Sequence, residues 1–193
     1  MQRPGSRRAW LSCARGCVLL FVTVLAVASR PGPGSAETTA SEAQVKAAYL
    51  FNFAKFVKWP DAPSFANSDN FRICVLGQDP FGDILDATVR GEKLDGKPIV
   101  VQRLHRAQDA GSCRMVFVSK SERGSLSALL PTLKAPVLTV SDIPDFSRHG
   151  GMIEFVEQDG RVRFVVNLQA AQQSGLTVSS ELLKVASAVR GIP

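Results

Sequence analysis

A serine, two aspartates and a histidine near the middle of the chain are residue types that can carry hydrolytic chemistry. Ser141, Asp142, Asp145 and His149 follow a short apolar run that is typical of a strand. Active sites of α/β proteins usually lie at such positions, beyond the carboxyl end of a parallel strand. Ser141 is not on the Gly-x-Ser-x-Gly turn of an α/β hydrolase, and turn formation at Asp145 explains the cluster without chemistry. We therefore predict no catalytic centre, with a hydrolase using Ser141 or His149 as the alternative.

A glycine-containing turn at residues 77–82 is a second place where a ligand could bind. It follows an apolar run and precedes a predicted helix, and phosphate groups bind at helix N-termini. The turn lacks the spacing of a dinucleotide fingerprint and of a P-loop, and Asp79 would repel phosphate. The simpler interpretation is Asp79 as N-cap with Pro80 at the first helical position. A metabolite pocket between residues 77–81 and 141–149 remains a hypothesis. Its expected lining residues are Asp79, Phe81, Asp142 and His149.

The first 36 residues are typical of a secretory signal peptide. They hold five arginines and no acidic residue, and an apolar run over 18–28 leads to small residues before a cleavage site after Ala36. The apolar run is shorter than the roughly 17–25 residues that span a membrane. An uncleaved anchor, cleavage after Ala28 and twin-arginine export through Arg7-Arg8 are the alternatives. We predict a periplasmic protein whose mature domain is 37–193.

The net charge of the chain is +6, but this excess belongs to the export segment. Without the five arginines, 18 basic residues face 17 acidic ones, so residues 37–193 are close to neutral. Nucleic-acid binding depends on basic surfaces, and we therefore expect no nucleic-acid partner. His105 and His149 are far apart in the sequence and no acidic cluster accompanies them, so we expect neither a metal site nor a cofactor.

Cys74 and Cys113 are the two cysteines that remain after residue 36. Two cysteines in an oxidising compartment favour a disulfide. A metal site and a redox pair are alternatives, but the spacing is far from Cys-x-x-Cys. Cys74 falls in the first predicted strand and Cys113 just before the third. These strands are neighbours in a flavodoxin-like order, and adjacent strands about 5 Å apart permit the bond.

The first helix of the mature chain offers a protein-contact surface. A capping box at Ser41-Glu-Ala-Gln44 predicts its start, and Trp59-Pro60 its end. We expect its apolar arc to be buried. The arc contains Val45, Tyr49, Leu50, Phe53, Phe56 and Val57. An aromatic side chain between cations on the opposite side is typical of a contact surface. The predicted partner-binding residues are Phe51, Lys55, Lys58 and Trp59. Phe51 packed under the following loop, and a structural Trp59, are the alternatives.

The rest of the chain alternates short apolar runs with helical stretches. We expect strands at 71–76, 98–104, 114–119 and 136–140 and helices at 80–89, 105–111 and 122–133. This rhythm predicts an α/β fold in three layers, with a mostly parallel flavodoxin- or Rossmann-like sheet. Asp159-Gly160 predicts an added antiparallel C-terminal hairpin. A last helix from about Ser179 should bury Leu182, Leu183, Ala186 and Val189.

These stretches together resemble the YfiR-like family of periplasmic regulatory proteins. The matching segments cover nearly all of the mature chain in the expected order. They are Val45–Pro60, Ile73–Gly77, Asp79–Gly82, Val137–Asp142, Gly150–Phe155, Gly160–Asn167 and Ser179–Lys184. The resemblance implies an exported α/β protein without a catalytic centre, in which the pair Cys74–Cys113 matches a family disulfide. Some members carry a second pair near Gly150–Met152, and its absence here predicts a simpler redox response.

The resemblance also implies a function. The best-known members inhibit a membrane-bound diguanylate cyclase by binding its periplasmic sensor domain, an outer-membrane lipoprotein can relieve the inhibition, and members form dimers. We therefore expect a homodimeric periplasmic binding protein that represses a membrane-bound signalling enzyme, either a diguanylate cyclase of cyclic-di-GMP signalling or a sensor kinase. The alternative is a periplasmic small-molecule receptor whose ligand controls partner binding.

Overall fold

A computed structural model describes residues 34–61, 68–133 and 136–191, and every structural statement below concerns these residues. They belong to one compact unit, Pro33–Pro193. The predicted signal peptide falls almost entirely outside the described residues, so both it and the start of the mature domain stay predictions.

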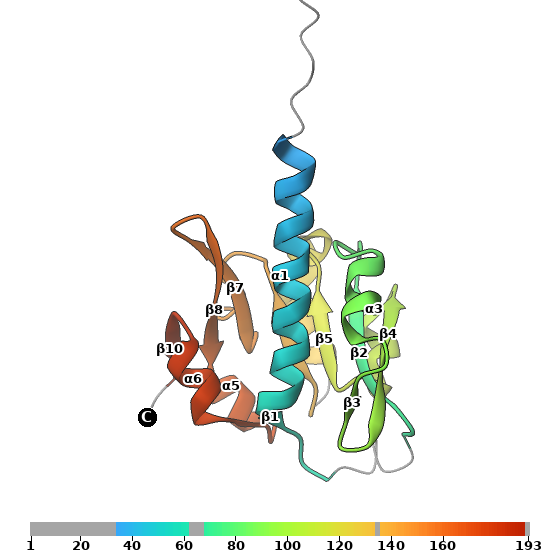
Figure 1. The fold of residues 1–193 in the computed structure, drawn as a ribbon. Coiled ribbons are helices and arrows are strands. Elements are labelled where there is room, and N and C mark those ends of the chain that lie inside the picture. Colours follow the sequence, from blue (N-terminus) through green and yellow to red (C-terminus); the bar gives the residue numbers. More distant parts are fainter. Residues whose placement is uncertain (1–33, 62–67, 134–135, 192–193) are drawn as a thin grey trace, which may run out of the picture. The chain divides into compact units, whose positions relative to one another are not determined.

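A mostly parallel eight-stranded sheet forms the centre of this unit (Figure 1). In spatial order its strands are β10 (Ala188–Arg190), β8 (Arg161–Asn167), β7 (Ile153–Gln158), β6 (Leu138–Ser141), β5 (Met115–Val118), β2 (Phe71–Leu76), β4 (Lys97–Leu104) and β3 (Lys93–Leu94). Strands β4, β2, β5, β6 and β7 pair in parallel, whereas β8 is antiparallel to β7. The first four predicted strands lie in the order second, first, third, fourth, which confirms the flavodoxin-like prediction.

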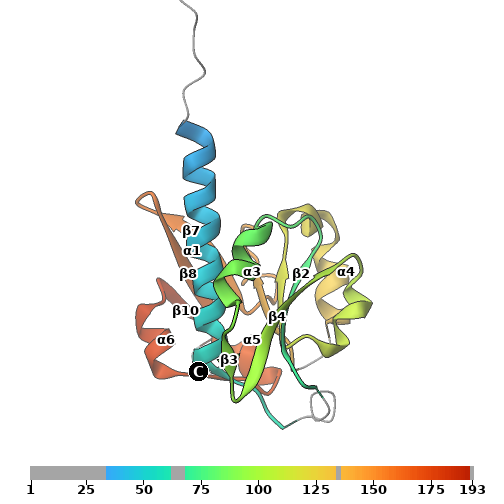
Figure 2. The same cartoon turned by 45° about the vertical axis from the view of Figure 1, so that its right-hand side comes forward.

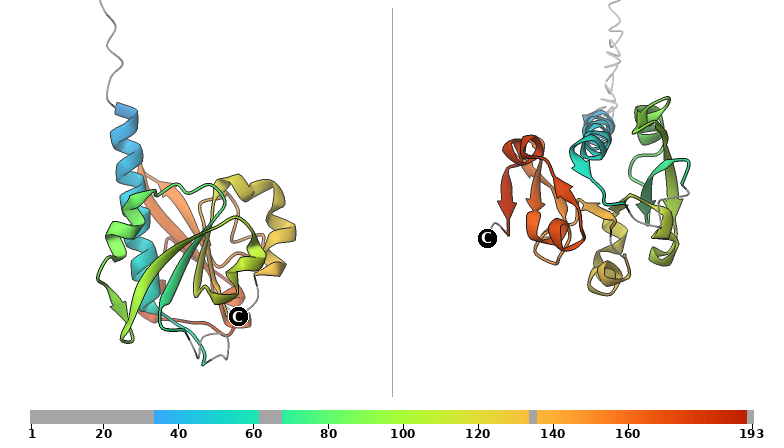
Figure 3. Two further views of the ribbon diagram at one scale, coloured as in Figure 1. Left: turned by 90° about the vertical axis from the view of Figure 1, so that its right-hand side faces the viewer. Right: turned by 90° about the horizontal axis from the view of Figure 1, so that it is seen from below.

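Helices cover both faces of the sheet, as the three-layer prediction requires (Figures 2 and 3). On one side α1 (Gly34–Phe56), α3 (Asp83–Val89), α5 (Leu168–Gln173) and α6 (Ser180–Val185) contribute to one hydrophobic core. The second core lies under α4 (Leu126–Leu129) and the 3-10 helices η1 (Ala107–Ser112), η2 (Lys120–Ser125) and η3 (Leu130–Thr132). The predicted α/β class is confirmed.

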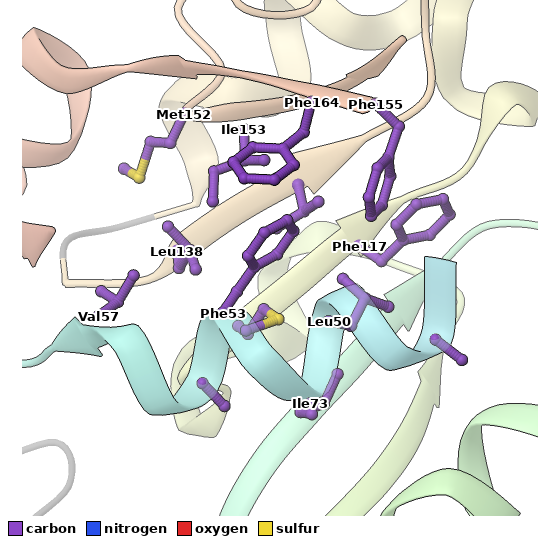
Figure 4. Close-up of a cluster of buried hydrophobic side chains, with 14 of the residues drawn as sticks. Leu50, Phe53, Val57, Ile73, Phe117, Leu138, Met152, Ile153, Phe155 and Phe164 are labelled. Atoms are coloured by element: carbon purple, nitrogen blue, oxygen red, sulfur yellow. The ribbon is translucent and has the colours of Figure 1, made fainter. Parts of the chain in front are cut away.

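Aromatic side chains make much of the core under α1 (Figure 4). Phe53 is fully buried, and its ring centre lies 5.0 Å from that of Phe164 in an edge-to-face arrangement. Tyr49 contacts the same ring at 5.3 Å. Burying one such ring stabilises the fold by about 2–3 kcal/mol, so α1 is held mainly by apolar burial.

Helix α1 differs from its prediction in two respects. It begins at Gly34, so Ser41 lies inside the helix and the predicted capping box is wrong; Ala36, Glu37 and Ala40 favour helix and nothing there stops it. Val45 and Phe56 are each 39% exposed and are not in the core. The buried stripe is instead built on small residues that let the helix approach the sheet closely. These are Ala43, Ala47 and Ala54, with Leu50, Phe53 and Val57.

A second, two-stranded sheet holds the end of α1. Strand β1 (Val57–Lys58) pairs in antiparallel fashion with β9 (Thr177–Val178). The Ser179 amide then donates to the carbonyl oxygen of Phe56 at 2.9 Å. The sequence did not predict this sheet, because strands of two residues carry no hydrophobic periodicity.

The C-terminal hairpin is confirmed and the last helix is shorter than predicted. Asp159 and Gly160 both have positive φ angles, 53° and 67°, as a type I′ turn between β7 and β8 requires. Ser179 caps α6 by accepting a hydrogen bond from the Leu182 amide at 3.2 Å. The helix ends at Val185, however, and Val189 pairs with Val166 in the sheet, because the outer edge of β8 offers backbone hydrogen bonds.

Two other predicted helices are shorter or broken. The stretch 122–133 is divided into η2, α4 and η3, since Gly124 favours helix weakly and Pro131 cannot donate a backbone hydrogen bond. The predicted helix at 80–89 begins only at Asp83, after Gly82 with a φ of 51°. Both differences shorten helices at the carboxyl edge of the sheet.

Candidate functional site

The disulfide is present between Cys74 in β2 and Cys113, two residues before β5. Their Cα atoms lie 6.0 Å apart, and both side chains are fully buried in the core under α4. The neighbouring pair of strands predicted from the sequence therefore brings the two cysteines together. Because neither sulfur is exposed, the bond acts within the core and not as a surface thiol pair.

The predicted partner site lies on the outer side of α1. Lys55 places Nζ 3.7 Å from the ring centre of Phe51, a cation–π contact at the surface. Phe51 is half-buried and packs beside the core, so it does not face fully away from it, whereas Lys55 and Lys58 are exposed. The structure thus brings Phe51 and Lys55 together and leaves the ammonium group of Lys55 accessible.

Two apolar residues that the sequence placed in the core are partly exposed on another flank of α1. Val45 and Phe56 are 11 positions apart, close to three helical turns, so they lie along one line of α1. Each exposes 39% of its surface. Val45, Tyr49 and Phe56, at positions i, i+4 and i+11, form one apolar stripe in the sequence. The spacing alone does not tell whether this stripe or the one with the alanines faces the sheet. Around the helix, however, Val45 and Phe56 lie roughly 120° or more from Phe51, so they do not adjoin it. We call Phe51, Lys55 and Lys58 the α1 outer surface.

Trp59, the remaining predicted partner residue, is engaged within the chain. Its Nε1 donates to the carbonyl oxygen of Arg114 at 2.8 Å, and its ring meets that of Phe71 edge to face at 5.0 Å. These contacts account for Trp59 through packing of the segment that follows α1.

Hydrogen bonds within the turn at residues 77–82, and from Arg103 of β4, hold this turn in place. Asp79 Oδ1 accepts from the Phe81 amide at 2.7 Å, and Oδ2 accepts from Arg103 Nε at 2.9 Å. It therefore caps the turn and not the helix, which starts later. Arg103 also bonds to Asp86, which raises the pKa of the arginine and lowers that of the Asp86 carboxyl. Phe81 is 2% exposed and packs against Phe117.

The residues after β6 have separate structural roles. The fully buried Ser141 donates from Oγ to the Val118 carbonyl oxygen and accepts from the Ile143 amide, which leaves it no role as a nucleophile. The exposed His149 places Nδ1 2.8 Å from the Asp145 carbonyl oxygen. Neither is arranged with a base or acid as a hydrolase requires.

A pocket of about 740 Å³ lies between α1, the β7–β8 hairpin and the carboxyl end of β6. Asp142 lines it, but Asp79, Phe81 and His149 do not. The four residues predicted for a ligand site therefore do not together line this pocket, and β5 lies between β2 and β6 in the sheet. The lining residues are Glu42, Val45, Lys46, Tyr49, Lys120, Asp142, Pro144, Glu154, Phe155, Val156, Glu157, Gly160, Arg161, Val162 and Arg163.

A buried ion pair closes one end of the pocket. Lys46 Nζ lies 2.6 Å from both Glu42 Oε1 and Asp142 Oδ2, and Lys120 Nζ approaches the same Asp142 oxygen at 3.5 Å. Burial alone would lower the pKa of Lys46, but the hydrogen bonds to Asp142 and Glu42 outweigh it and raise the pKa. Lys46 is therefore a permanent cation at neutral pH, and sequence reasoning had given it no role.

A second buried carboxylate makes one wall of the pocket rigid. Glu154 accepts from the Asp145 amide at 2.9 Å, and from the amide of Ser147 at 3.0 Å and its hydroxyl at 2.5 Å. It thereby holds Asp145 at a φ of 62°, in the left-handed region. Both Glu154 oxygens have partners, so this group shapes the loop.

Within 34–61, 68–133 and 136–191 no group of three or more histidine, cysteine or acidic residues is placed to hold a metal ion. In the same ranges no helix is both long and apolar enough to cross a membrane.

Comparison with known proteins gives one family and a shared fold. A family model described as YfiR/HmsC-like matches residues 43–187. A search among curated proteins found no significant match. Among solved structures, a conserved domain protein from Vibrio cholerae O1 biovar El Tor is 10% identical with a TM-score of 0.53. An ABC domain in complex with L-Trp from Streptococcus pneumoniae is 11% identical with the same TM-score. Each alignment covers 77% of this chain but 60% of the other, and at such identity it supports the fold alone.

Proposed function

Because the chain belongs to the YfiR/HmsC-like family, we propose that it regulates a membrane-bound signalling protein by binding that protein's periplasmic domain. The family is one of periplasmic regulators and not a known enzyme family. The proposed target is a diguanylate cyclase or a sensor kinase, and the proposed effect is repression. The chemistry of such a protein is a binding equilibrium.

The observation that carries this proposal is the cation–π pair on the α1 outer surface. Lys55 Nζ lies 3.7 Å from the ring centre of Phe51, and Lys58 is a second exposed cation just after the same helix. Aromatic side chains are enriched at protein contacts, and charged side chains at the rim of a contact favour a partner of opposite charge. The surface fits a partner whose contact patch is apolar with acidic residues at its rim.

The remaining partners belong to the same proposal. A homodimer, and an outer-membrane lipoprotein that relieves repression, would need surfaces besides the α1 outer surface. The loop 142–152, in which Asp145, Arg148 and His149 are exposed, is the second candidate, and Asp145 and Arg148 form a surface ion pair at 3.2 Å.

A binding experiment with matched variants tests the contact surface. The periplasmic domain of a membrane-bound diguanylate cyclase or sensor kinase from the same organism is titrated with the purified protein, with Phe51→Ala and with Lys55→Glu. The control is Arg123→Glu, an equal charge reversal at an exposed position of η2 on the other side of the sheet. We expect both α1 variants to weaken binding at least tenfold, and the control to bind as the unchanged protein does. Equal affinities for all four proteins would contradict the proposed surface.

A second candidate function is a small-molecule receptor whose ligand controls partner binding. The pocket of about 740 Å³ beside α1 favours it, since ligand sites are commonly concave, partly apolar and of this size. Val45, Lys46 and Tyr49 of α1 line the pocket, so a bound ligand would act on the same helix that carries the α1 outer surface.

A further inference from the structure

The second half of β7 has no partner strand on the side that faces β6. Strand β6 pairs with β7 only as far as Ser141 opposite Glu154, whereas β7 continues to Gln158. In the part of the chain that the structure describes, no other strand pairs with β7 on this side. We call the stretch Phe155–Gln158 the open edge of β7. An edge without a partner presents backbone N–H and C=O groups to which another strand can add.

The backbone groups of two residues point out from the open edge. In an antiparallel pair, successive residues turn their backbone groups alternately toward the partner strand and away from it. The Asn167 amide donates to the Met152 carbonyl oxygen at 2.7 Å, so the even-numbered residues of β7 face β8, as the two-residue turn at the tip also requires. Phe155 and Glu157 therefore turn away from β8. Beyond the pairing with β6, the Phe155 carbonyl and the amide and carbonyl of Glu157 meet the pocket, which both residues line.

The side of the open edge next to α1 is largely apolar. The ring centre of Phe155 lies 5.9 Å from that of Tyr49 in α1. Val162 is on the same side, because it lies two residues from Phe164, the cross-strand partner of Phe155. Val45 of α1, which is 39% exposed, lines the same pocket. Apolar side chains of an added strand would be buried here.

The opposite side of the open edge carries two arginines. Arg161 and Arg163 lie two residues apart in β8 and alternate with Val162, so both point to the side away from α1. Both line the pocket, and Arg161 is exposed while Arg163 is half-buried. None of the ion pairs among the described residues includes either arginine.

The acidic groups of the lining equal the basic ones in number but not in position. Glu42, Lys46, Asp142 and Lys120 bind one another and form a neutral cluster. Glu154 is buried and accepts three hydrogen bonds from the loop that follows β6. The lining charges that remain are negative on the α1 side and positive on the opposite side, from Glu157 and from the two arginines, respectively. With Glu154 included, the side of the arginines still keeps a net positive charge.

We propose that an extended segment of a protein partner adds to β7 as a further strand along Phe155–Gln158, and that apolar residues alternate with acidic ones in this segment. Its apolar side chains pack on Val45, Tyr49 and Val162, and its acidic side chains pair with the two arginines. Main-chain hydrogen bonds supply the affinity of such an added strand, and alternate side chains supply its specificity. The proposal goes beyond the proposed function, because the open edge of β7 is not part of the α1 outer surface.

Two heptapeptides of opposite charge test the side-chain chemistry. Both are acetylated and amidated, and one alternates valine with aspartate whereas the other alternates valine with lysine. Each is titrated into the purified protein by calorimetry. We expect the aspartate peptide to bind, and to do so at least tenfold more tightly than the lysine peptide, because it meets the two arginines.

N-methylation of the aspartate peptide tests the strand pairing. One derivative is methylated on the valine nitrogens and the other on the aspartate nitrogens. The amides of alternate residues face opposite edges of a strand, so only one of the two sets points to β7. We expect one derivative to lose binding and the other to keep it.

Variants of the protein locate the site. Glu157→Pro removes an N–H of the open edge without loss of a bond to β8, and it should weaken binding of the aspartate peptide at least tenfold, whereas Glu157→Ala keeps the N–H and should still bind. Arg163→Glu should weaken binding of the aspartate peptide and strengthen that of the lysine peptide. The control Arg123→Glu, outside the pocket lining, should change neither. Melting temperatures show whether Glu157→Pro folds, and the methylated peptides give an answer if it does not.

The proposal is overturned if the aspartate peptide does not bind or binds no more tightly than the lysine peptide. Equal binding of the two methylated peptides, or equal binding by Glu157→Pro and Glu157→Ala, would overturn it as well. These titrations use only the purified protein and synthetic peptides. Loss of binding to a membrane signalling protein would bear only on the proposed function, so the two failures are distinguishable.

Discussion

Lys46 Nζ lies 2.6 Å from Asp142 Oδ2, although the two residues are 96 positions apart in the sequence. The pair joins the middle of α1 to the carboxyl end of β6. Both residues line the pocket, and the pair also anchors the helix that carries the proposed contact surface. A change at either residue therefore reaches both candidate sites.

Removing Lys46 should destabilise the fold strongly. Lys46→Met leaves the buried Asp142 carboxylate with only the more distant Lys120, and breaking a buried ion pair from one side costs about 3 kcal/mol. Urea unfolding measures this. The control is Lys184→Met, whose pair with Glu181 is exposed and contributes about 0.3 kcal/mol. Similar losses of unfolding free energy in the two variants would contradict the larger contribution of the buried pair.

The same pair predicts a pH dependence in the alkaline range. The pKa of Lys46 is raised in the folded protein above its ordinary value of 10.5. The unfolded chain therefore loses this proton first, and the stabilisation is complete below pH 10.5 and is lost as the pH rises above it. Unfolding free energies of the unchanged protein should fall more steeply above this pH than those of Lys46→Met. Parallel curves would contradict the assignment.

Loss of the disulfide should be costly but should leave the pocket in place. It closes a loop of 39 residues, and the chain-entropy model gives about 4 kcal/mol for a loop of this length. Cys74→Ala combined with Cys113→Ala should lower the unfolding free energy by about this amount. Because both sulfurs are buried, dithiothreitol should reduce the bond only as fast as the protein opens. Rapid reduction under native conditions would argue against the buried bond.

Gly151 should tolerate no side chain. A Cβ there would lie 2.1 Å from Cε1 of the fully buried Phe146, whereas at Gly150 nothing lies within 4 Å. Gly151→Ala should therefore cost about 3 kcal/mol through overpacking. Gly150→Ala should cost about 1 kcal/mol, because its φ of 97° disfavours a side chain. Thermal unfolding of the two variants measures the difference, and the reverse ranking would contradict the packing of Phe146.

The parts of the fold that the sequence predicted correctly depend on local patterns. The strand Phe71–Leu76 was predicted with both of its ends correct, because its apolar run is bounded by Gly77. The hairpin was recognised from Asp159-Gly160, whose turn geometry few other residue pairs adopt. The cysteine pair was predicted because two cysteines remain after the export segment, and a flavodoxin-like strand order agreed with this pairing.

The parts that were missed depend on tertiary contacts. Val189 has helical spacing from Leu182, yet it joins the sheet because β8 has an open edge. Val45 and Phe56 match the period of α1, but alanines on the other stripe let the helix lie closer to the sheet. Lys46 is a polar residue that is buried because it pairs with Asp142, 96 residues away in the sequence. No local sequence pattern predicts such a pair.

The affinity of this protein for the periplasmic domain of a membrane-bound diguanylate cyclase or sensor kinase from the same organism tests the central claim most directly. Titration should give at least tenfold weaker binding for Lys55→Glu than for the unchanged protein, while Arg123→Glu should bind as the unchanged protein does. Unchanged affinity of Lys55→Glu, together with that of Phe51→Ala, would contradict the account.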